Sequence, residues 1–115
     1  MNLTRHGNNA EIQVHVQEDH AMRKLGFTDS REGYWYKSVS LDGDITFNIT
    51  IAKDRSDWRI DILDEDYGQP YDYQHMIASK SKNAYPYMIW YLVCNEMKKL
   101  IEAGIISNWS WYDYL

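Results

Sequence analysis

Residues 84–103, AYPYMIWYLVCNEMKKLIEA, decide the fold of this 115-residue chain. Their apolar side chains recur every three or four positions, which predicts one face of an α-helix: Ile89, Leu92, Val93, Met97, Leu100 and Ile101. Asn83 can cap the start of this helix, and Gly104 can end it. At about 1.5 Å per residue the helix would extend about 30 Å, the width of a small domain. Its apolar face therefore needs a second layer to cover it.

Three predicted strands supply that layer. Residues 45–51, ITFNITI, alternate strictly between apolar and polar side chains and predict a central strand. Residues 34–41, YWYKSVSL, precede it across the turn Asp42-Gly43-Asp44, and residues 58–62, WRIDI, follow it. These strands form an antiparallel meander with one apolar face, which the helix at 84–103 would cover.

The N-terminal part of the chain is less regular. Residues 1–10 are polar and predict a flexible segment, which leaves residues 11–115 as a single domain. Residues 11–16 fit either a short strand or the start of a helix. Residues 17–25 predict a short helix that Gly26 ends, with Phe27 returning to the core. The predicted class is α+β: a three- to four-stranded antiparallel meander, a short N-terminal helix and a long C-terminal helix packed on one face.

Two further segments carry many aromatic side chains. Residues 64–74, DEDYGQPYDYQ, contain Gly68 and Pro70 and predict a loop rather than a regular element, with a turn of helix over 75–79. The tail after Gly104, IISNWSWYDYL, is too aromatic for a solvated end. It fits a strand at the sheet edge, a segment packed across the helix, or a surface for a partner.

The charge of the chain is negative and uneven. The net charge is −5, which argues against nonspecific nucleic-acid binding because such binding needs clustered lysine and arginine. Residues 54–72 hold seven acids against two arginines, whereas residues 80–99 hold four lysines against one glutamate. We therefore expect a dipolar molecule if the two blocks lie on different faces.

Cysteine content and hydropathy indicate where in the cell the protein is located. Cys94 is the only cysteine, so no internal disulfide can form, and it lies beside the apolar face of the long helix. There is no basic and apolar leader and no continuous apolar run long enough to span a membrane. We expect a soluble, cytoplasmic protein that does not bind membranes.

The acidic, tyrosine-rich loop and the aromatic C-terminus are the predicted interaction surface. Acidic groups can steer a basic protein partner, and tyrosine and tryptophan supply contact area. The residues of this surface are Asp64, Glu65, Asp66, Tyr67, Tyr71, Asp72, Tyr73, Trp109 and Trp111. The leading hypothesis is a non-enzymatic protein-binding domain, including the case in which its acidic surface imitates nucleic-acid charge.

Neither catalysis nor a metal site is predicted. The acids of the loop lack the alternating ligand spacing of a calcium site, and the four histidines are scattered over positions 6, 15, 20 and 75. Cys94 and the serines have no nucleophile motif around them, and no glycine-rich phosphate loop occurs. The sequence therefore predicts no catalytic residue, metal or cofactor.

Three alternatives stay open. Helix, three strands, helix is the element order of double-stranded-RNA-binding domains, and Lys80, Lys82, Lys98 and Lys99 could form a nucleic-acid face. A small enzyme or ligand carrier could have a pocket between sheet and helix, walled by Trp35, Trp58 and Trp90. The aromatic tail could also pair two copies in a homodimer.

Four short stretches of the sequence carry a resemblance to other proteins. They are Leu25-Gly26-Phe27, Tyr34-Trp35-Tyr36, the strand at 47–51 and the loop segment at 68–73. Together they resemble small uncharacterised proteins of Gram-positive bacteria and their phages, over residues 22–75. The resemblance implies a cytoplasmic, mobile-element origin and a role in binding and blocking host machinery. It implies no catalytic residues.

Overall fold

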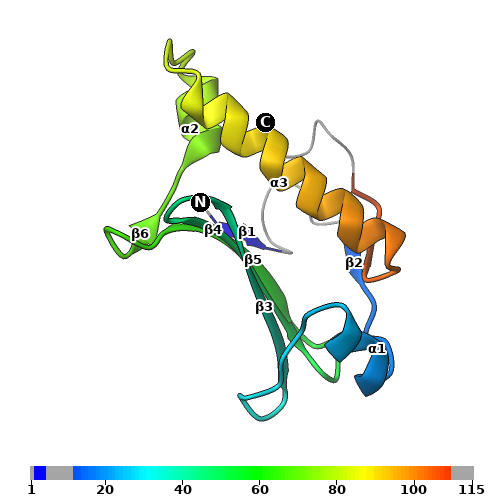
Figure 1. Cartoon of the computed structure of the whole chain (residues 1–115). Helices are drawn as coiled ribbons and strands as arrows, with labels where there is room; N and C mark the ends of the chain where they lie inside the picture. Colours follow the sequence, from blue (N-terminus) through cyan, green and yellow to red (C-terminus); the bar gives the residue numbers. More distant parts are fainter. Residues whose placement is uncertain (1, 5–11, 110–115) are drawn as a thin grey trace.

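A single curved sheet and one long helix form the body of the molecule (Figure 1). The computed structural model describes residues 2–4 and 12–109. The strands of the sheet are β1 (Asn2–Thr4), β3 (Tyr34–Asp42), β4 (Ile45–Ala52), β5 (Trp58–Asp64) and β6 (Gln69–Pro70). All pairs are antiparallel, in the order β1-β5-β4-β3, and β6 pairs with β5. The predicted α+β class and the three-strand meander are confirmed, with β1 as a fourth strand.

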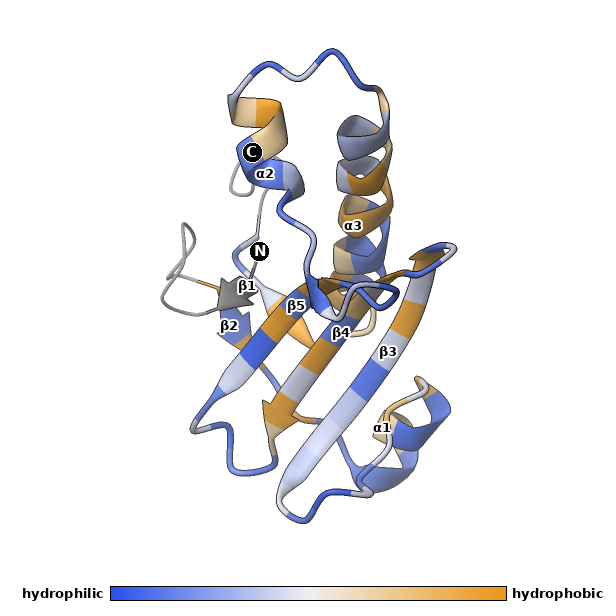
Figure 2. Ribbon diagram, turned by 90° about the vertical axis from the view of Figure 1, so that its left-hand side faces the viewer, coloured by the Kyte–Doolittle hydropathy of each residue, from blue (hydrophilic) through white to orange (hydrophobic). Residues whose placement is uncertain are grey.

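The register of the sheet places its apolar side chains on one face. Ile49 of β4 lies opposite Ile60 of β5, and Ile51 lies between Trp35 and Trp58. These five side chains are at most 6% exposed. Alternation with period two puts them all on the same side of the sheet, which explains the strict pattern of residues 45–51. Figure 2 shows the resulting hydrophobic bands across β4 and β5.

The opposite face of the sheet is polar and hydrogen-bonded. The Tyr36 hydroxyl donates to Asn48 Oδ1 (2.9 Å), and Asn48 Nδ2 donates to Thr46 Oγ1 (2.8 Å). Tyr36 is 41% exposed, whereas Asn48 is 5% exposed beneath it. A buried amide is tolerated here because its polar atoms have partners. This face meets solvent along β3, where Ser38 and Ser40 are also exposed.

Two helices end in the same way and turn the chain into the core. Helix α1 (Asp19–Lys24) is followed by Gly26, with φ of 97°, and the Phe27 amide donates to the Met22 carbonyl. Helix α3 (Tyr85–Glu102) is followed by Gly104, with φ of 78°, and the Ile105 amide donates to the Leu100 carbonyl. This is the glycine-terminated Schellman geometry, in which the residue after glycine packs on the core. The predictions for Gly26, Phe27 and Gly104 are confirmed.

The long helix covers the apolar face of the sheet with a narrower stripe than expected. Ile89, Val93, Met97 and Leu100 are buried, Leu92 is half-buried, and Ile101 is 37% exposed. The assignment of Ile101 to the buried stripe is wrong, because one residue past Leu100 rotates the side chain about 100° around the helix. The prediction that Asn83 caps this helix is wrong by one residue, because the N-cap is Ala84, and Asn83 Oδ1 accepts from the Tyr85 amide from the position before it. Helix α2 (Tyr73–Ala78) packs beside the first turns of α3.

The two ambiguous segments pair with each other. Strand β2 (Gln13–Val14) and strand β7 (Ile106–Ser107) form a separate antiparallel pair. The His15 amide adds a hydrogen bond to the Ile105 carbonyl (2.7 Å). Residues 12–16 are therefore not the start of a helix, and the tail adds its strand to β2 rather than to the edge of the main sheet. Of the segment expected to be flexible, residues 2–4 form β1, and the others lie outside the described residues.

A buried amide in α2 gives a stability prediction. Gln74 is 3% exposed, and neither its Oε1 nor its Nε2 has a hydrogen-bond partner among the described residues. Burying an amide without partners costs about 1–3 kcal/mol. Replacing Gln74 with methionine, which has a similar shape, should therefore raise the free energy of unfolding by about 1 kcal/mol. Urea denaturation measures the change.

The control for this variant is Gln13→Met, at an exposed position of β2. That change should leave the free energy of unfolding nearly unchanged. A Gln74→Met protein less stable than the wild type would show that the amide has partners the structure does not display.

Candidate functional site

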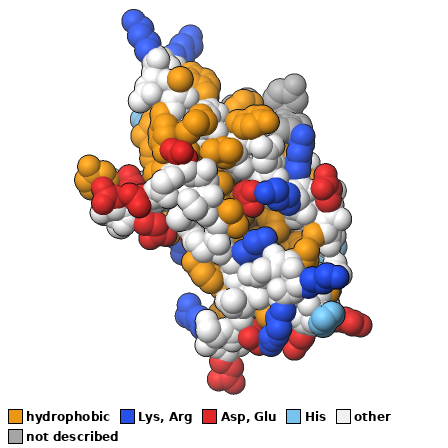
Figure 3. Space-filling view, viewed as in Figure 1, with side chains coloured by type: hydrophobic (Ala, Val, Ile, Leu, Met, Phe, Trp, Pro, Cys, Tyr) orange, Lys and Arg blue, Asp and Glu red, His pale blue; other side chains and the backbone are white. Residues whose placement is uncertain are grey.

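Two turns at one end of the sheet gather five carboxylates. The turn between β3 and β4 lies beside the turn between β5 and β6, and the Glu65 amide donates to the Asp44 carbonyl (2.8 Å). We call this surface the acidic tip; its members are Asp42, Asp44, Asp64, Glu65, Asp66 and Tyr67. In Figure 3 acidic and hydrophobic side chains project together at the left-hand edge, where Figure 1 places β6.

Local hydrogen bonds fix the shape of the acidic tip. Asp64 Oδ1 accepts from the amides of Asp66 (3.1 Å) and Tyr67 (3.4 Å), which closes the turn after β5. Glu65 Oε1 accepts from the Thr46 hydroxyl (2.8 Å) on the polar face of the sheet. Tyr67 itself is 74% exposed. The tip therefore presents an unburied aromatic ring on a turn that is held from below.

A tyrosine from α3 anchors the other turn of the tip. The Tyr85 hydroxyl donates to Asp42 Oδ2 (2.8 Å), and the Tyr71 ring meets the Tyr85 ring edge to face at 5.9 Å. Burial, together with this hydrogen bond, raises the pKa of Tyr85 to about 12. The hydroxyl therefore stays protonated and remains a donor to Asp42 over the physiological range of pH.

Three residues of the predicted surface have structural positions instead. Asp72 caps α2, since its Oδ1 accepts from the His75 amide (3.0 Å). Tyr73 is fully buried, and Tyr71 is half-buried against Tyr85. Burial raises the pKa of Tyr71, as expected for a phenol that is partly removed from water. Of the loop at 64–73, the exposed part is therefore residues 65–70.

The aromatic C-terminus does not lie beside the acidic tip. Trp109 follows β7 and is half-buried against the core. Figure 1 places β7 and β6 on opposite sides of the molecule. Trp111 lies outside the described residues. Trp109 and the acidic tip are therefore two separate surfaces rather than one.

The four lysines of the alternative nucleic-acid face are also separated. Lys80 and Lys82 lie between α2 and α3, whereas Lys98 and Lys99 lie near the end of α3. The helix between them spans about 20 Å at 1.5 Å per residue. Lys99 pairs with Glu96 at 2.9 Å. Figure 3 shows one basic pair above α2 and further basic side chains lower on the molecule.

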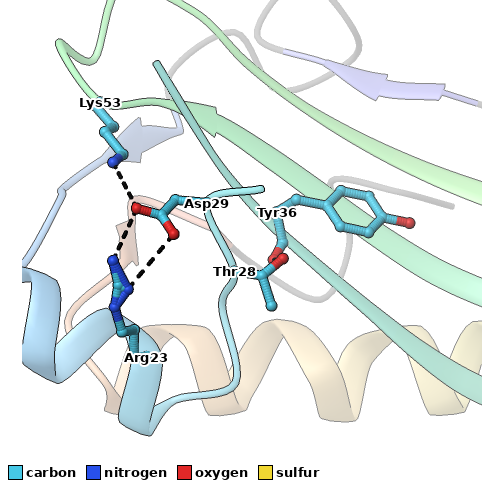
Figure 4. Close-up of polar contacts among 5 residues, drawn as sticks. All are labelled: Arg23, Thr28, Asp29, Tyr36 and Lys53. Carbon is cyan, nitrogen blue, oxygen red and sulfur yellow. Dashed lines mark hydrogen bonds and ion pairs between the residues drawn. The ribbon is translucent and has the colours of Figure 1, made fainter. Parts of the chain in front are cut away.

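The three tryptophans lie on three different elements, Trp35 on β3, Trp58 on β5 and Trp90 on α3. Trp35 is fully buried, with Arg23 and Lys53 lying 5.3 and 4.6 Å from its ring centroid. Both cations also pair with Asp29, at 2.8 and 2.9 Å (Figure 4). This cluster ties α1, the segment before β3 and the end of β4 together. Trp58 is 6% exposed in the core, and Trp90 is half-buried on α3.

Asp29 gives a pH-dependent prediction. The hydrogen bond from Lys53, followed by the charge of Arg23, lowers its pKa below the ordinary value. A lowered folded-state pKa adds stability that is present above the unfolded pKa and is lost as the pH falls through the folded pKa. Asp29→Asn should therefore reduce stability at pH 7, and the difference from wild type should shrink below about pH 4. Thermal unfolding at both pH values measures it.

The control is Asp44→Asn, because the exposed Asp44 side chain makes no hydrogen bond or ion pair with the residues that the structure describes. This change should alter the melting temperature little at either pH. Equal destabilisation by Asp29→Asn at both pH values would contradict an electrostatic role for Asp29.

A pocket of about 270 Å³ lies between α1, the apolar face of the sheet and the last turns of α3. Its apolar walls come from all three elements, and its charged side chains are three lysines and one glutamate. The lining residues are Lys24, Leu25, Phe27, Lys37, Val39, Phe47, Glu96, Lys99, Leu100 and Ala103. None of Trp35, Trp58 and Trp90 is among them. The sequence predicted no pocket lined by these residues, although the lysine at position 37, on the core-facing side of a strand, was a visible signal.

Cys94 and the acidic residues offer little reactive chemistry. Cys94 is 1% exposed, and burial raises the pKa of its thiol to about 12, so it stays protonated and shielded. Within residues 2–4 and 12–109, no three His, Cys, Asp or Glu side chains are grouped so that they could hold a metal ion. In the same part of the chain no helix is long and apolar enough to cross a membrane.

Comparison with known proteins identifies a protein of similar fold but indicates no activity. The sequence matches no protein-family model and no curated protein. The structure is similar to the crystal structure of a DUF1831 family protein from Lactobacillus plantarum, with a TM-score of 0.57 and 16% sequence identity. The match covers 83% of this chain and 82% of that protein. The shared fold therefore extends over nearly the whole chain, and it is found in a Gram-positive bacterium.

Proposed function

We propose that this protein is a non-enzymatic, cytoplasmic protein-binding domain of Gram-positive bacteria or their phages. We further propose that its acidic tip contacts a basic partner. The observation that carries the proposal is Tyr67, which is 74% exposed among the carboxylates of the tip. Tyrosine is enriched in protein interfaces because it supplies contact area with few rotatable bonds. The surrounding acids would steer a positively charged surface toward it.

The rigidity of the tip supports a docking role. Glu65 is held by two hydrogen bonds, one from its amide to Asp44 and one from Thr46 to its carboxylate. Asp64 closes the same turn through the amides of Asp66 and Tyr67. A turn that is ordered before binding loses less conformational entropy when a partner docks. Glu65, Asp66 and Tyr67 are therefore the contact residues we propose, with Asp64 holding them in place.

The partner we expect is a protein with a basic groove, including one that normally holds nucleic-acid phosphates. Five carboxylates on two adjacent turns give a dense negative surface, whereas Lys80 and Lys82, before α3, lie about 20 Å from Lys98 and Lys99 near its end. This distribution favours a protein partner over direct nucleic-acid binding, which needs a continuous basic surface. Self-association through the aromatic tail is a separate proposal, which a mass measurement in solution tests.

A capture experiment with charge-matched variants tests the proposal. Tagged wild-type protein is incubated with a nuclease-treated Gram-positive lysate beside a Glu65→Lys, Asp66→Lys variant and a Glu32→Lys, Glu102→Lys control. Glu32 and Glu102 are exposed acids outside the tip, so both variants change the net charge equally. Asp64 is left intact because it closes the turn.

The expected result is a basic protein retained by the wild type and the control and lost from the tip variant. The amount of partner retained by the wild type and the control should fall as the salt concentration rises, because the contact is electrostatic. Equal retention by the tip variant and the wild type would contradict the proposal, as would loss from both double variants, which would indicate dependence on net charge alone.

A further inference from the structure

A lysine occupies a core-facing position in the sheet. Lys37 of β3 lies between Trp35 and Val39 in the alternating pattern, and its register partner is the fully buried Ile49 of β4. Its side chain is half-buried. Lysine is rarely placed among buried apolar residues unless its charge has a partner. Its position on this face therefore calls for an explanation.

The side chain of Lys37 is held in place beside α1. A Cβ built on Gly26 would lie 3.3 Å from Lys37 Cε, so the lysine stem lies against the backbone of the α1 end. Lys37 Nζ is 5.9 Å from the centroid of the Phe27 ring. No carboxylate of the described residues pairs with it within ion-pair distance. Among the residues that it describes, the structure thus presents a positioned ammonium group without an anionic partner.

This ammonium group lines the 270 Å³ pocket at the end of α3. Lys24 and Lys99 line the same pocket, and Glu96 is its one acid. Glu96 is 9% exposed, and its Oε2 accepts from Lys99 Nζ at 2.9 Å. The glutamate is thus neutralised by Lys99, and the charges of Lys24 and Lys37 are left facing the pocket. The remaining walls are apolar, with Phe27 and Phe47 each 2% exposed.

We propose that this pocket binds a medium-chain aliphatic carboxylate, with the carboxylate on Lys37 and Lys24 and the chain against Phe27, Phe47 and Leu100. A water molecule occupies about 30 Å³, so the pocket has room for about nine non-hydrogen atoms. Octanoate, a medium-chain fatty acid with ten non-hydrogen atoms, is close to that size. The combination of apolar walls with a few placed polar groups is characteristic of small-molecule sites.

The charge and the walls each exclude simpler ligands. An inorganic anion would leave the apolar walls of Phe27, Val39 and Phe47 uncovered, so it would gain nothing from most of the pocket. A neutral alcohol of the same chain length would fill the walls but leave Lys37 without a counter-charge. A charge-assisted hydrogen bond to a carboxylate is stronger than a neutral one, so the acid should be preferred.

Calorimetric titration with sodium octanoate and with octanol tests this proposal. Octanoate should bind the wild-type protein with a Kd of about 1 mM or tighter, as expected for a ligand with so few atoms. Octanol should bind about tenfold more weakly, and Lys37→Met should weaken octanoate binding by about the same factor. Methionine keeps the length of the lysine stem, so the variant should remain folded.

Two further variants keep the test independent of the stability of Lys37→Met. Lys98→Met alters a lysine of α3 that does not line the pocket and should leave octanoate binding unchanged. Val39→Phe fills the pocket from β3 and should abolish binding while the circular dichroism spectrum stays native. Absence of octanoate binding to the wild type would overturn the proposal. Equal affinities for octanol and octanoate, or an unchanged affinity in folded Val39→Phe, would also overturn it.

Discussion

Replacing Trp35 with alanine is expected to lower the free energy of unfolding by about 3–5 kcal/mol. Trp35 is fully buried on the core face of β3, opposite Ile51. Its ring also lies beneath Arg23 and Lys53, which converge on Asp29. The substitution would leave a large cavity and remove the aromatic surface that these cations cover. Urea denaturation followed by circular dichroism measures the change.

Tyr67→Ala is the control for Trp35→Ala, because it removes an aromatic ring that is 74% exposed. It should leave the stability nearly unchanged. If the two variants lost similar stability, the placement of Trp35 in the core and of Tyr67 on the surface could not both hold.

Replacing Met97 with alanine should cost about 2–5 kcal/mol of stability. Met97 is fully buried at the centre of the α3 stripe, whereas Met88 of the same helix is 39% exposed. Met88→Ala removes the same side chain from the same helix, so helix propensity changes equally in the two variants. The difference between their unfolding free energies therefore reports burial against the sheet alone.

A Met88→Ala variant as destabilised as Met97→Ala would contradict the rotation of α3 about its axis. A loss of stability in Met97→Ala alone would confirm which face of the helix covers the sheet.

Periodicity was sufficient to predict the body of the fold. The alternation of residues 45–51 corresponds to the buried face of β4, and the three- and four-residue spacing before Gly104 corresponds to α3. Both signals are local, since each depends on a repeat within one element. Gly26 and Gly104 were also readable, because only the chain near a helix end sets that geometry. The prediction that Ile101 is buried was wrong, because the edge of the buried stripe depends on how the helix is tilted against the sheet.

Pairings between distant segments could not be predicted. Strands β2 and β7 contribute two residues each and lie more than ninety positions apart, so neither has enough alternation to identify a partner. Residues 69–70 likewise pair with β5 as β6, although Gly68 and Pro70 indicated an irregular loop. Pro70 is tolerated there because β6 is a short edge strand, where a missing amide is accepted.

In the candidate site, too, features set by neighbouring residues could be predicted, whereas features set by the fold could not. Composition identified the acidic loop, but hydrogen bonds separate Asp64 and Asp72, which hold the backbone, from Asp66 and Tyr67 at the surface. The predicted meander puts the turn at 42–44 and the loop after residue 62 at the same end of the sheet, but the hydrogen bond from the Glu65 amide to Asp44 that joins them could not be predicted from the sequence. The pocket beside Lys37 depends on three elements meeting, and only the lysine itself was visible beforehand.

The central claim is that a partner protein docks on the acidic tip, and site-specific photo-crosslinking tests it most directly. A benzophenone amino acid is placed at Tyr67 in one protein and at Tyr91, 58% exposed on α3, in another. After irradiation in a nuclease-treated Gram-positive lysate, we expect one crosslinked partner from position 67 and none from position 91. A crosslink from position 91 alone, or none from position 67, would contradict docking at the tip.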